Sequence, residues 1–337
     1  MSRDFSRYDF TKFDPNKKYN LYTDADTIAY SCAAACSKEP CLVTHKSSGR
    51  KKEFENFEVF YDFLLNDPKG SKFKVDDFNV PLIGFALSNV RSKIDAIESY
   101  SWVNSNKIYI QGKDNFRYQV YPEYKSNRGK KPALHQFCFN YMLNKYKGRI
   151  EVVNGYESED FVIADAALDP LGIRAYIDKD LEGHHGLFLN YNNLDLGVFY
   201  IDPIQAFYNL SVQLLVGDST DAIRGIDFVS TELREAFNVK VKSIGKKTAE
   251  KLLEDVKHSK IEMKKRVIEV YKLSYGDDWK DALTLTGKLI YITKERGKVF
   301  DLELFCKGVN EWIFNNKEIK KSTKIWFLNL ITTVSLK

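Results

Sequence analysis

The stretch that decides both the fold and the site reads GDSTDAIRGI at residues 217–226 and, after an insertion, SIGKKTAEKLL at residues 243–253. Its first part carries two aspartates, Asp218 and Asp221, and carboxylate oxygens are ligands of hard divalent cations. Its second part is a glycine turn that leads into a lysine-rich helix start, and such a turn presents backbone N–H groups to a phosphate. We therefore expect metal binding and phosphate binding to occur side by side.

The composition is that of a globular protein. The chain has 337 residues, of which 44% are hydrophobic and 29% charged, so it can bury one large core or the cores of two fused subdomains. No apolar run is long enough to span a bilayer, and the polar start of the chain lacks the apolar core of a secretory signal. The formal net charge of +5 permits nucleic-acid binding without requiring it. We expect a cytoplasmic protein, located in the host cytoplasm if it is viral.

The cysteines and histidines indicate no zinc site. The five cysteines are odd in number and irregularly spaced, and Cys32 and Cys36 would share one helix face. Because no histidine or second cysteine pair completes a zinc pattern, we expect reduced thiols. His184 and His185 lie in a glycine-flanked turn, for which we expect a surface turn in preference to a metal site.

Strand and helix patterns alternate along the chain. Short apolar runs predict strands at 19–23, 107–111, 151–153 and 174–177, and a β-hairpin at 187–201. Helical spacing predicts helices at 28–35, 57–65, 81–102, 132–147, 161–168, 203–216, 231–237, 262–275 and 280–292. We assign Phe85 to the buried stripe of the helix at 81–102, and the aromatic residues Trp312, Phe314, Trp326 and Phe327 of the tail to a core. Repeated strand–helix units predict a mostly parallel sheet flanked by helices.

Acidic residues follow several of these strands. A helix cap accounts for one acidic residue at each place, such as Asp26, but not for the clusters. At the carboxyl edge of a parallel sheet, where ligands bind, such carboxylates would raise one another's pKa unless cations were bound. The candidate metal ligands are Asp24, Asp26, Glu157, Glu159, Asp160, Asp178, Asp180, Asp218 and Asp221.

This ligand set indicates the kind of metal. Hard oxygen ligands without His or Cys favour Mg²⁺, with Mn²⁺ as a substitute, over Zn²⁺. So many carboxylates suit two ions about 4 Å apart that clamp an in-line phosphoryl displacement, one activating a water and the other steadying the leaving oxygen. No serine, cysteine or histidine nucleophile is then required.

Residues 113–131 combine six basic residues with four aromatic ones. Unpaired bases stack on aromatic rings while Lys and Arg neutralise the nucleic-acid backbone, so the composition is typical of a nucleic-acid-binding segment. The competing interpretation is a solvated basic loop whose rings pack inward.

Taken in order, these motifs resemble those of the flap endonuclease and 5′→3′ exonuclease family, in its phage-type branch. Asp24-Ala25-Asp26 resembles the site of the family's first metal-binding aspartate, and Tyr124-Lys125-Ser126-Asn127-Arg128 resembles its Tyr-Lys-x-Asn-Arg segment near a helical arch. Residues 157–160 and 178–180 resemble its Glu-x-Asp-Asp and Asp-x-Asp motifs. Residues 217–225 and 244–249 resemble its helix–three-turn–helix motif, which binds duplex DNA. The resemblance covers roughly residues 19–255.

The resemblance implies a fold and a division into domains. Residues 19–204 would form a PIN-like α/β nuclease domain, in which helices flank a mostly parallel sheet and a helical arch stands near the metal site. Residues 205–337 would form a helical C-terminal subdomain that carries the helix–three-turn–helix motif.

The resemblance also implies roles for single residues. Two Mg²⁺ ions would be held by the acidic residues named above, and Lys125, assisted by Arg128 and Arg117, would contact the scissile phosphate. Tyr124 would stack on the terminal base. Gly245, Lys246, Lys247 and Thr248 would grip the duplex backbone, with room for a K⁺ ion at the hairpin. The expected protein is a monomeric Mg²⁺-dependent nuclease of DNA replication or repair, acting on 5′ flaps, nicked duplexes or RNA–DNA hybrids.

Three departures from the family pattern are visible. Glu159 stands where the family has Asp, which lengthens one candidate ligand. Gln111 and Gly112 follow the second strand where the family has an aspartate, and whether Asp114 substitutes is open. An insertion at 227–242, with a predicted helix at 231–237, separates the two halves of the duplex-binding motif.

Two other functions fit parts of the sequence. The run Thr23–Thr27 is similar to the Asp-x-Asp-x-Thr motif of haloacid-dehalogenase-type phosphatases, with its threonine one position early, and Asp24 would be the nucleophile. That family makes no use of residues 157–160, and its late acidic loop follows a strand, whereas residues 205–216 have helical spacing. A non-catalytic DNA-junction binder is the second alternative, although a binder of polyanions would have no use for so many carboxylates.

Overall fold

The central strand of the fold is β1 (Tyr19–Asp24), the first of the predicted strands. Alternate residues of a strand face opposite sides of a sheet. Leu21 therefore packs into the hydrophobic core on one side, while Tyr22 packs against the core on the other side. The computed structural model describes residues 7–309.

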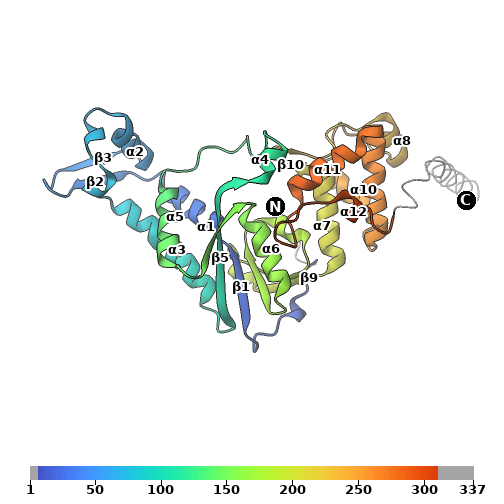
Figure 1. Cartoon of the computed structure of the whole chain (residues 1–337), viewed down its shortest axis with the longest axis horizontal. Helices are drawn as coiled ribbons and strands as arrows, with labels where there is room; N and C mark the ends of the chain where they lie inside the picture. The colour runs from blue at the N-terminus through green and yellow to red at the C-terminus, as the bar shows by residue number, and fades with distance from the viewer. Residues whose placement is uncertain (1–6, 310–337) are drawn as a thin grey trace, which may run out of the picture.

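Six strands form the main sheet, and β1 lies near its middle. Five of them run parallel, and β9 closes one edge as an antiparallel strand paired with β8. In spatial order the strands are β6 (Ile150–Gly155), β5 (Val103–Asn115), β1, β7 (Gly172–Tyr176), β8 (Gly186–Asn190) and β9 (Val198–Ile201). Because the parallel strands point the same way, their carboxyl ends meet at one edge of the sheet (Figure 1).

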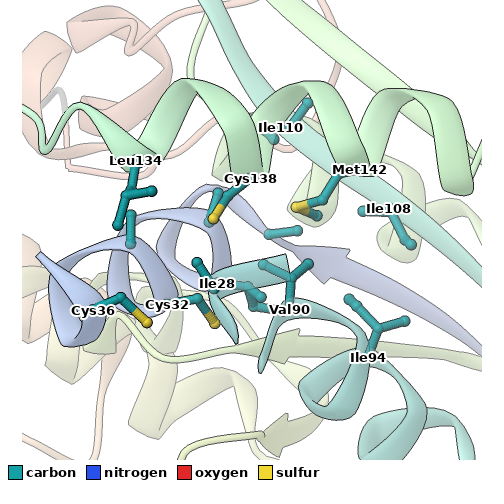
Figure 2. Close-up of a cluster of buried hydrophobic side chains, with 14 of the residues drawn as sticks. Ile28, Cys32, Cys36, Val90, Ile94, Ile108, Ile110, Leu134, Cys138 and Met142 are labelled. Carbon is teal, nitrogen blue, oxygen red and sulfur yellow. The ribbon is translucent and has the colours of Figure 1, made fainter. Parts of the chain in front are cut away.

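Helices cover both faces of the sheet. On one face, α1 (Asp26–Cys36), α3 (Pro81–Glu98) and α5 (Leu134–Lys145) pack against one another and against β1 and β5. Figure 2 shows this layer, in which Cys32, Val90 and Cys138 come from the three helices. On the other face, α6 (Ser158–Leu168) packs against β1, β5 and β7. The expected α/β fold, with a mostly parallel sheet flanked by helices, is confirmed.

A small lobe extends from the end of this layer (Figure 1). It consists of a three-stranded antiparallel sheet and one helix. Its elements are β2 (Cys41–His45), β3 (Lys51–Phe54), β4 (Phe78–Asn79) and α2 (Phe57–Asn66).

The C-terminal helices have a hydrophobic core of their own, which also contains Tyr124. These helices are α7 (Pro203–Val216), α8 (Thr231–Phe237), α9 (Lys246–Leu253), α10 (Lys260–Tyr275), α11 (Trp279–Ile290) and α12 (Leu302–Cys306). The first of them begins at Pro203, because the Asp202 side chain caps it by accepting from the N–H groups of Ile204 and Gln205. A division of the chain between residues 204 and 205 stays a prediction and would cut into this helix.

The helix boundaries at 203–216 and 231–237 agree with the prediction. Several other boundaries differ, and two of them have a clear physical cause. The helix predicted to reach Trp102 ends at Glu98, because the Tyr100 carbonyl accepts from the Val103 N–H in a turn, where the Tyr100 and Trp102 rings stack 5.1 Å apart. The strand predicted at 107–111 extends to Asn115, since its far end still pairs with Gly155 of β6.

The expected helical arch is largely absent from the described chain between β5 and α5. One short helix, α4 (Phe116–Val120), is followed by an irregular segment that runs from Tyr121 to Ala133. Pro122 and Pro132, which lack a backbone N–H, lie at the two ends of this segment. Figure 1 shows the segment crossing from the C-terminal helices back to α5.

Two predictions of side-chain burial or exposure are wrong, and a third concerns residues outside the described part of the chain. Phe85 is 63% exposed, because it lies beside the buried stripe of α3 and not within it. His184 is buried, since the turn that contains it is packed against Tyr291. The aromatic residues of the tail, from Trp312 onward, lie outside the described residues. No helix among residues 7–309 is long and apolar enough to cross a membrane.

The contrast between two apolar residues of α3 provides a test of the packing. Ile94→Ala should lower the free energy of unfolding by about 2–5 kcal/mol, because the Ile94 side chain is fully buried. Phe85→Ala on the same helix should change it by no more than about 0.5 kcal/mol. Urea denaturation of both variants measures the difference, and equal losses would contradict the assigned face of the helix.

Candidate active site

The carboxyl ends of β1, β6 and β7 bring acidic residues from distant parts of the sequence together. Asp24 ends β1, and its Oδ1 accepts from the Ser158 hydroxyl at the start of α6, at 2.7 Å. Asp178 follows β7, the neighbour of β1, and opens the 3₁₀ turn η5 (Lys179–Gly183). The parallel sheet thus produces the gathering that the strand-end pattern predicts.

Four of these residues form what we call the acidic cluster: Asp24, Glu159, Asp178 and Asp180. Burial, together with the charges of Asp26 and Asp178, raises the pKa of Asp24 to about 7 despite the Ser158 hydrogen bond. Burial and the charges of Asp178 and Asp24 raise the pKa of Glu159 well above its ordinary value. Burial raises the pKa of Asp180 to about 8, with Asp178 and Asp218 adding to the effect. Negative charge is therefore crowded here without enough positive charge to balance it.

Two members of the cluster, Asp178 and Asp180, are each oriented by a hydrogen bond to one of their oxygen atoms. Asp178 Oδ1 accepts from the Asp180 N–H at 3.0 Å, and Asp180 Oδ1 accepts from Gln213 Nε2 of α7 at 2.7 Å. Next to them, Asp218 Oδ1 accepts from the Thr220 N–H at 2.7 Å. In each case this contact orients the carboxylate and leaves its second oxygen without a hydrogen bond among the described residues.

Two other acidic residues, Glu157 and Asp221, are instead paired with cations. Glu157 is paired with Lys125, and Asp221 Oδ1 accepts from Arg128 Nε at 2.7 Å. Burial opposes the ionisation of Glu157, but the Lys125 and Arg117 charges outweigh it and lower the pKa of Glu157 to about 2. These pairs hold Lys125 and Arg128 beside the acidic cluster.

Asp160, expected to be a metal ligand, has no room for a metal ion. Both of its oxygens are occupied: Arg117 donates to Oδ2 at 2.7 Å and to Oδ1 at 3.1 Å, while the N–H groups of Glu157 and Thr293 donate at 2.9 Å each. The residue is fully buried. The metal-binding assignment of Asp160 is therefore wrong, and its role is structural.

The roles expected for Arg117 and Tyr124 must be corrected as well. Arg117 is 1% exposed and also donates to the carbonyls of Leu289 and Tyr291, so it cannot reach a substrate phosphate. Tyr124 is 2% exposed, and its hydroxyl donates to Glu157 at 2.9 Å, so its ring cannot stack on a base. The alternative interpretation of the basic-aromatic segment, with rings packed inward, holds for this tyrosine.

Asp26 borders the acidic cluster but is paired with a cation, and Asp114 lies outside it. Asp26 is in the first turn of α1, where Lys131 approaches its carboxylate at 3.4 Å. Asp114 is exposed on β5, and no hydrogen bond or ion pair joins it to the cluster. Gln111, at the place of the family's aspartate, accepts from the Ser158 N–H and donates to the Tyr156 carbonyl, so it holds the loop before α6 in position.

The two halves of the opening stretch lie next to each other. Gly217 and Asp218 form β10 (Gly217–Asp218), which pairs with β11 (Ile223–Arg224) in a tight hairpin. A Cβ on Gly217 would lie 2.4 Å from the Gly225 nitrogen, and φ at Gly217 is +74°, so glycine is needed here. The Ile244 N–H donates to the Ile226 carbonyl at 3.0 Å, which joins the second half to the first.

The glycine turn of the second half opens α9. Gly245 is the N-cap of this helix and supplies no capping side chain, and Gly245, Lys246 and Lys247 are exposed, with Thr248 partly buried. Lys246 lines a cavity of about 190 Å³ that is also lined by Asp180 and Asp218. The helix start and the acidic edge therefore share one hollow in the surface.

The insertion at 227–242 folds back on itself. The Val229 N–H donates to the Lys242 carbonyl at 3.0 Å, which closes the insertion at its base. Ser230 caps α8, and its hydroxyl donates to the Leu273 carbonyl of α10 at 2.6 Å. The predicted extra helix thus exists and packs against α10, away from the turn that it interrupts.

Whether the site suits divalent metal ions can be judged from its donors. Within residues 7–309 no group of three or more His, Cys, Asp or Glu side chains is arranged to hold one ion as it stands. The acidic cluster and Asp218 nevertheless offer carboxylate oxygens, the donors that Mg²⁺ and Mn²⁺ take, and their raised pKa values reflect a charge that a cation would balance. The residues fit divalent metal through their chemistry and charge, without a preformed coordination shell.

Sequence reasoning missed the residues that hold the acids in place. Ser158 binds Asp24, and the Tyr191 hydroxyl donates to the Asp24 carbonyl at 2.6 Å. Ser158 lies inside the acidic motif at 157–160, which is a usable signal. Tyr191, in the loop after β8, carries no signal in the sequence.

The buried pair of Arg117 and Asp160 allows a prediction about stability. Arg117→Met should lower the free energy of unfolding by about 3–5 kcal/mol, because it leaves a buried carboxylate without its cation. Adding Asp160→Asn should restore part of the loss by removing that charge. Arg128→Met, in which a half-exposed side chain is lost, should cost no more than about 1 kcal/mol. Chemical denaturation measures all three, and equal costs for the two arginines would refute the structural role of Arg117.

Of the comparisons with known proteins, those with solved structures found matches. No protein-family model and no curated protein matches the sequence. Among solved structures, the chain is similar to a flap endonuclease of bacteriophage T5 in a product complex with DNA and metal ions, at 16% identity and a TM-score of 0.37, over 87% of this chain and 98% of that one.

Two further T5 structures are similar to the chain. One, crystallised with metal ions, is 13% identical with a TM-score of 0.36, and the other, a variant 5′-exonuclease, is 12% identical with a TM-score of 0.35. Each match covers 81% of this chain and 100% of the other. All three of these structures come from bacteriophage T5.

Proposed function

We propose that the chain is a divalent-metal-dependent nuclease that hydrolyses phosphodiester bonds of DNA near 5′ ends or at junctions of single strand and duplex. The observation that carries the proposal is the acidic cluster, a set of poorly solvated carboxylates with too few cations, beside Lys125 and Arg128. Such a set is costly for stability and is expected at a functional site.

Asp24, Glu159, Asp178, Asp180 and Asp218 would hold the metal ions. Asp178, Asp180 and Asp218 each have an oxygen without a hydrogen bond among the described residues, and Asp24 Oδ2 accepts a long hydrogen bond of 3.5 Å from Thr27. When bound, the ions would supply an activated water and stabilise the charge on the leaving oxygen. We do not include Asp26, Asp160 or Asp221 among the ligands, because Lys131, Arg117 and Arg128 already pair with them.

The chain's own cations would position the substrate. Lys125 and Arg128 lie at the edge of the cluster, held by Glu157 and Asp221, where they could share their charge with a scissile phosphate. At the start of α9, where Lys246 shares a hollow with Asp180 and Asp218, the exposed N–H groups and lysines would bind the duplex backbone. The two contacts would fix the distance between the cleaved bond and the duplex.

The phosphatase alternative is less well supported. Its late acidic loop requires a strand before Gly217-Asp218, but that segment follows α7. Asp24 is also 1% exposed and bound by Ser158, which restricts its use as a nucleophile.

A substitution in the acidic cluster tests the reaction. Asp178→Asn should reduce Mg²⁺-dependent cleavage of a 5′-flap or nicked duplex by at least about 100-fold, because it removes a metal ligand. Asp114→Asn, on the exposed part of β5, should retain activity and serves as the matched control. Cleavage in EDTA, or full activity of the Asp178 variant, would refute the metal mechanism. Hydrolysis of a small phosphate monoester alone would favour the phosphatase.

Duplex binding is tested separately. The double variant Lys246→Ala/Lys247→Ala should bind flap DNA more weakly, and the slope of log affinity against log salt should fall by about 2, because two phosphate contacts are lost. Binding is measured with Ca²⁺ in place of Mg²⁺ to prevent cleavage. Lys251→Ala, in the last turn of the same helix, is the control, and an equal effect there would argue against a specific role for the helix start.

A further inference from the structure

The glycine-flanked pair His184-His185 has no part in the proposed nuclease, yet it is not a simple surface turn. His184 is 3% exposed, and its Nδ1 is buried without a hydrogen-bond partner among the described residues. His185 is exposed beside it. A buried imidazole nitrogen without a partner is uncommon, because burial without a hydrogen bond costs free energy.

A buried arginine nearby also has a side-chain nitrogen without a hydrogen-bond partner among the described residues. Arg174 on β7 is 5% exposed, its Nε is buried without a partner, and it forms no ion pair within residues 7–309. Its guanidinium lies over the Phe188 ring, 5.4 Å from the centroid. At Gly186, a Cβ would lie 2.1 Å from one guanidinium nitrogen, so the glycine provides the space that Arg174 occupies.

The charged groups around this arginine are basic. Burial, followed by the charges of Lys294 and Arg174, lowers the pKa of His184 well below its ordinary value. Burial and the charges of Lys294 and Arg174 also lower the pKa of His185, with Lys260 contributing. Burial lowers the pKa of Arg174 to about 10, with only the Tyr200 and Tyr22 hydroxyls opposing it.

Within residues 7–309, no carboxylate is paired with this charge. The neighbouring charges that shift the pKa values of Arg174, His184, His185 and Lys294 include no Asp or Glu side chain. Glu182, two residues before His184, has both oxygens bound by the Tyr8 and Tyr176 hydroxyls at 2.9 and 2.7 Å. Glu295, next to Lys294, is paired with Lys298 at 3.0 Å. A buried guanidinium without a counter-charge destabilises a protein, so a bound anion would be stabilising here.

We propose that Arg174, His184, His185, Lys260 and Lys294 form a binding site for a phosphate group. Arg174 and His184 would form its inner wall, and the exposed side chains of His185 and Lys294 its entrance. Arginine matches the oxygens of phosphate with parallel N–H donors. The His184 ring is hydrogen-bonded to the Ile292 backbone, so its unpartnered Nδ1 would accept from a protonated phosphate oxygen.

This site is separate from the acidic cluster. Arg174 lies within β7, ahead of the strand's carboxyl end, and Gly186 is the first residue of β8. The proposal therefore does not depend on nuclease activity. The phosphate could belong to a small molecule or to a nucleic-acid backbone, and the experiment separates the two sources.

The test is the melting temperature of the full-length protein in inorganic phosphate, compared with chloride at equal ionic strength. The wild-type melting temperature should rise with phosphate concentration and then saturate. Arg174→Met should show no such rise. Without phosphate it should melt no lower than the wild type, because the substitution removes an unbalanced buried charge. Equal stabilisation of the two proteins by phosphate would overturn the proposal.

A second pair of variants keeps the test valid if Arg174→Met fails to fold. Lys294→Met should weaken phosphate binding roughly tenfold, as measured by calorimetry. Lys298→Met, four residues further on and paired with Glu295, should leave it unchanged. Equal effects of the two lysine variants, or no phosphate binding by the wild type, would refute the site.

Competition identifies the source of the phosphate. If a short DNA duplex, without divalent metal, displaces inorganic phosphate from the wild type, the site binds nucleic-acid backbone. If a deoxynucleoside 5′-monophosphate displaces it and the duplex does not, the site binds small phosphate monoesters. Displacement by neither would contradict a site for phosphate groups of larger molecules.

Discussion

The ion pair between Arg117 and Asp160 joins parts of the chain that are otherwise separate. Arg117 comes from α4 beyond β5, and Asp160 from the start of α6, while the carbonyls of Leu289 and Tyr291 and the Thr293 N–H come from the end of α11 and the segment after it. The pair thus fastens the C-terminal helices to the sheet. It also fixes where the segment after α4 begins, which places Tyr124 in the helical core and Lys125 at the acidic edge.

The acidic residues at this edge divide into two groups by their neighbours. Glu157, Asp160 and Asp221 form ion pairs with arginine or lysine side chains and hold those cations in position. Asp24, Glu159 and Asp180 each lie near the Asp178 carboxylate, and their pKa values stay raised because nearby cations do not offset burial and negative charge. Amino-acid type alone does not distinguish the groups, since both consist of Asp and Glu after strands. An acidic residue belongs to the first group when Arg117, Lys125 or Arg128 forms an ion pair with it.

The sequence was sufficient for the sheet and for most helices, because the apolar periodicity of β1 or α7 is a local property of the chain. It also predicted that Asp24 and Asp178 would meet, since parallel strands end at one edge. It could not show that Arg117 is buried, because burial depends on carbonyls some 170 positions away in the chain. The misassignment of Phe85 has a similar origin: its spacing fits the apolar stripe, but no neighbouring element covers that part of α3.

The layer between α1, α3 and α5 has a practical consequence for labelling chemistry. All five cysteines of the chain are buried free thiols, and burial raises the pKa of Cys41 to about 11 and that of Cys138 to about 12. Thiol reagents attack the thiolate, so these residues should react slowly in the folded state. A single cysteine placed on the exposed β2–β3 turn, at Ser47 for instance, would then be the most reactive thiol. A fluorophore attached there would report on the small lobe without removal of any native cysteine.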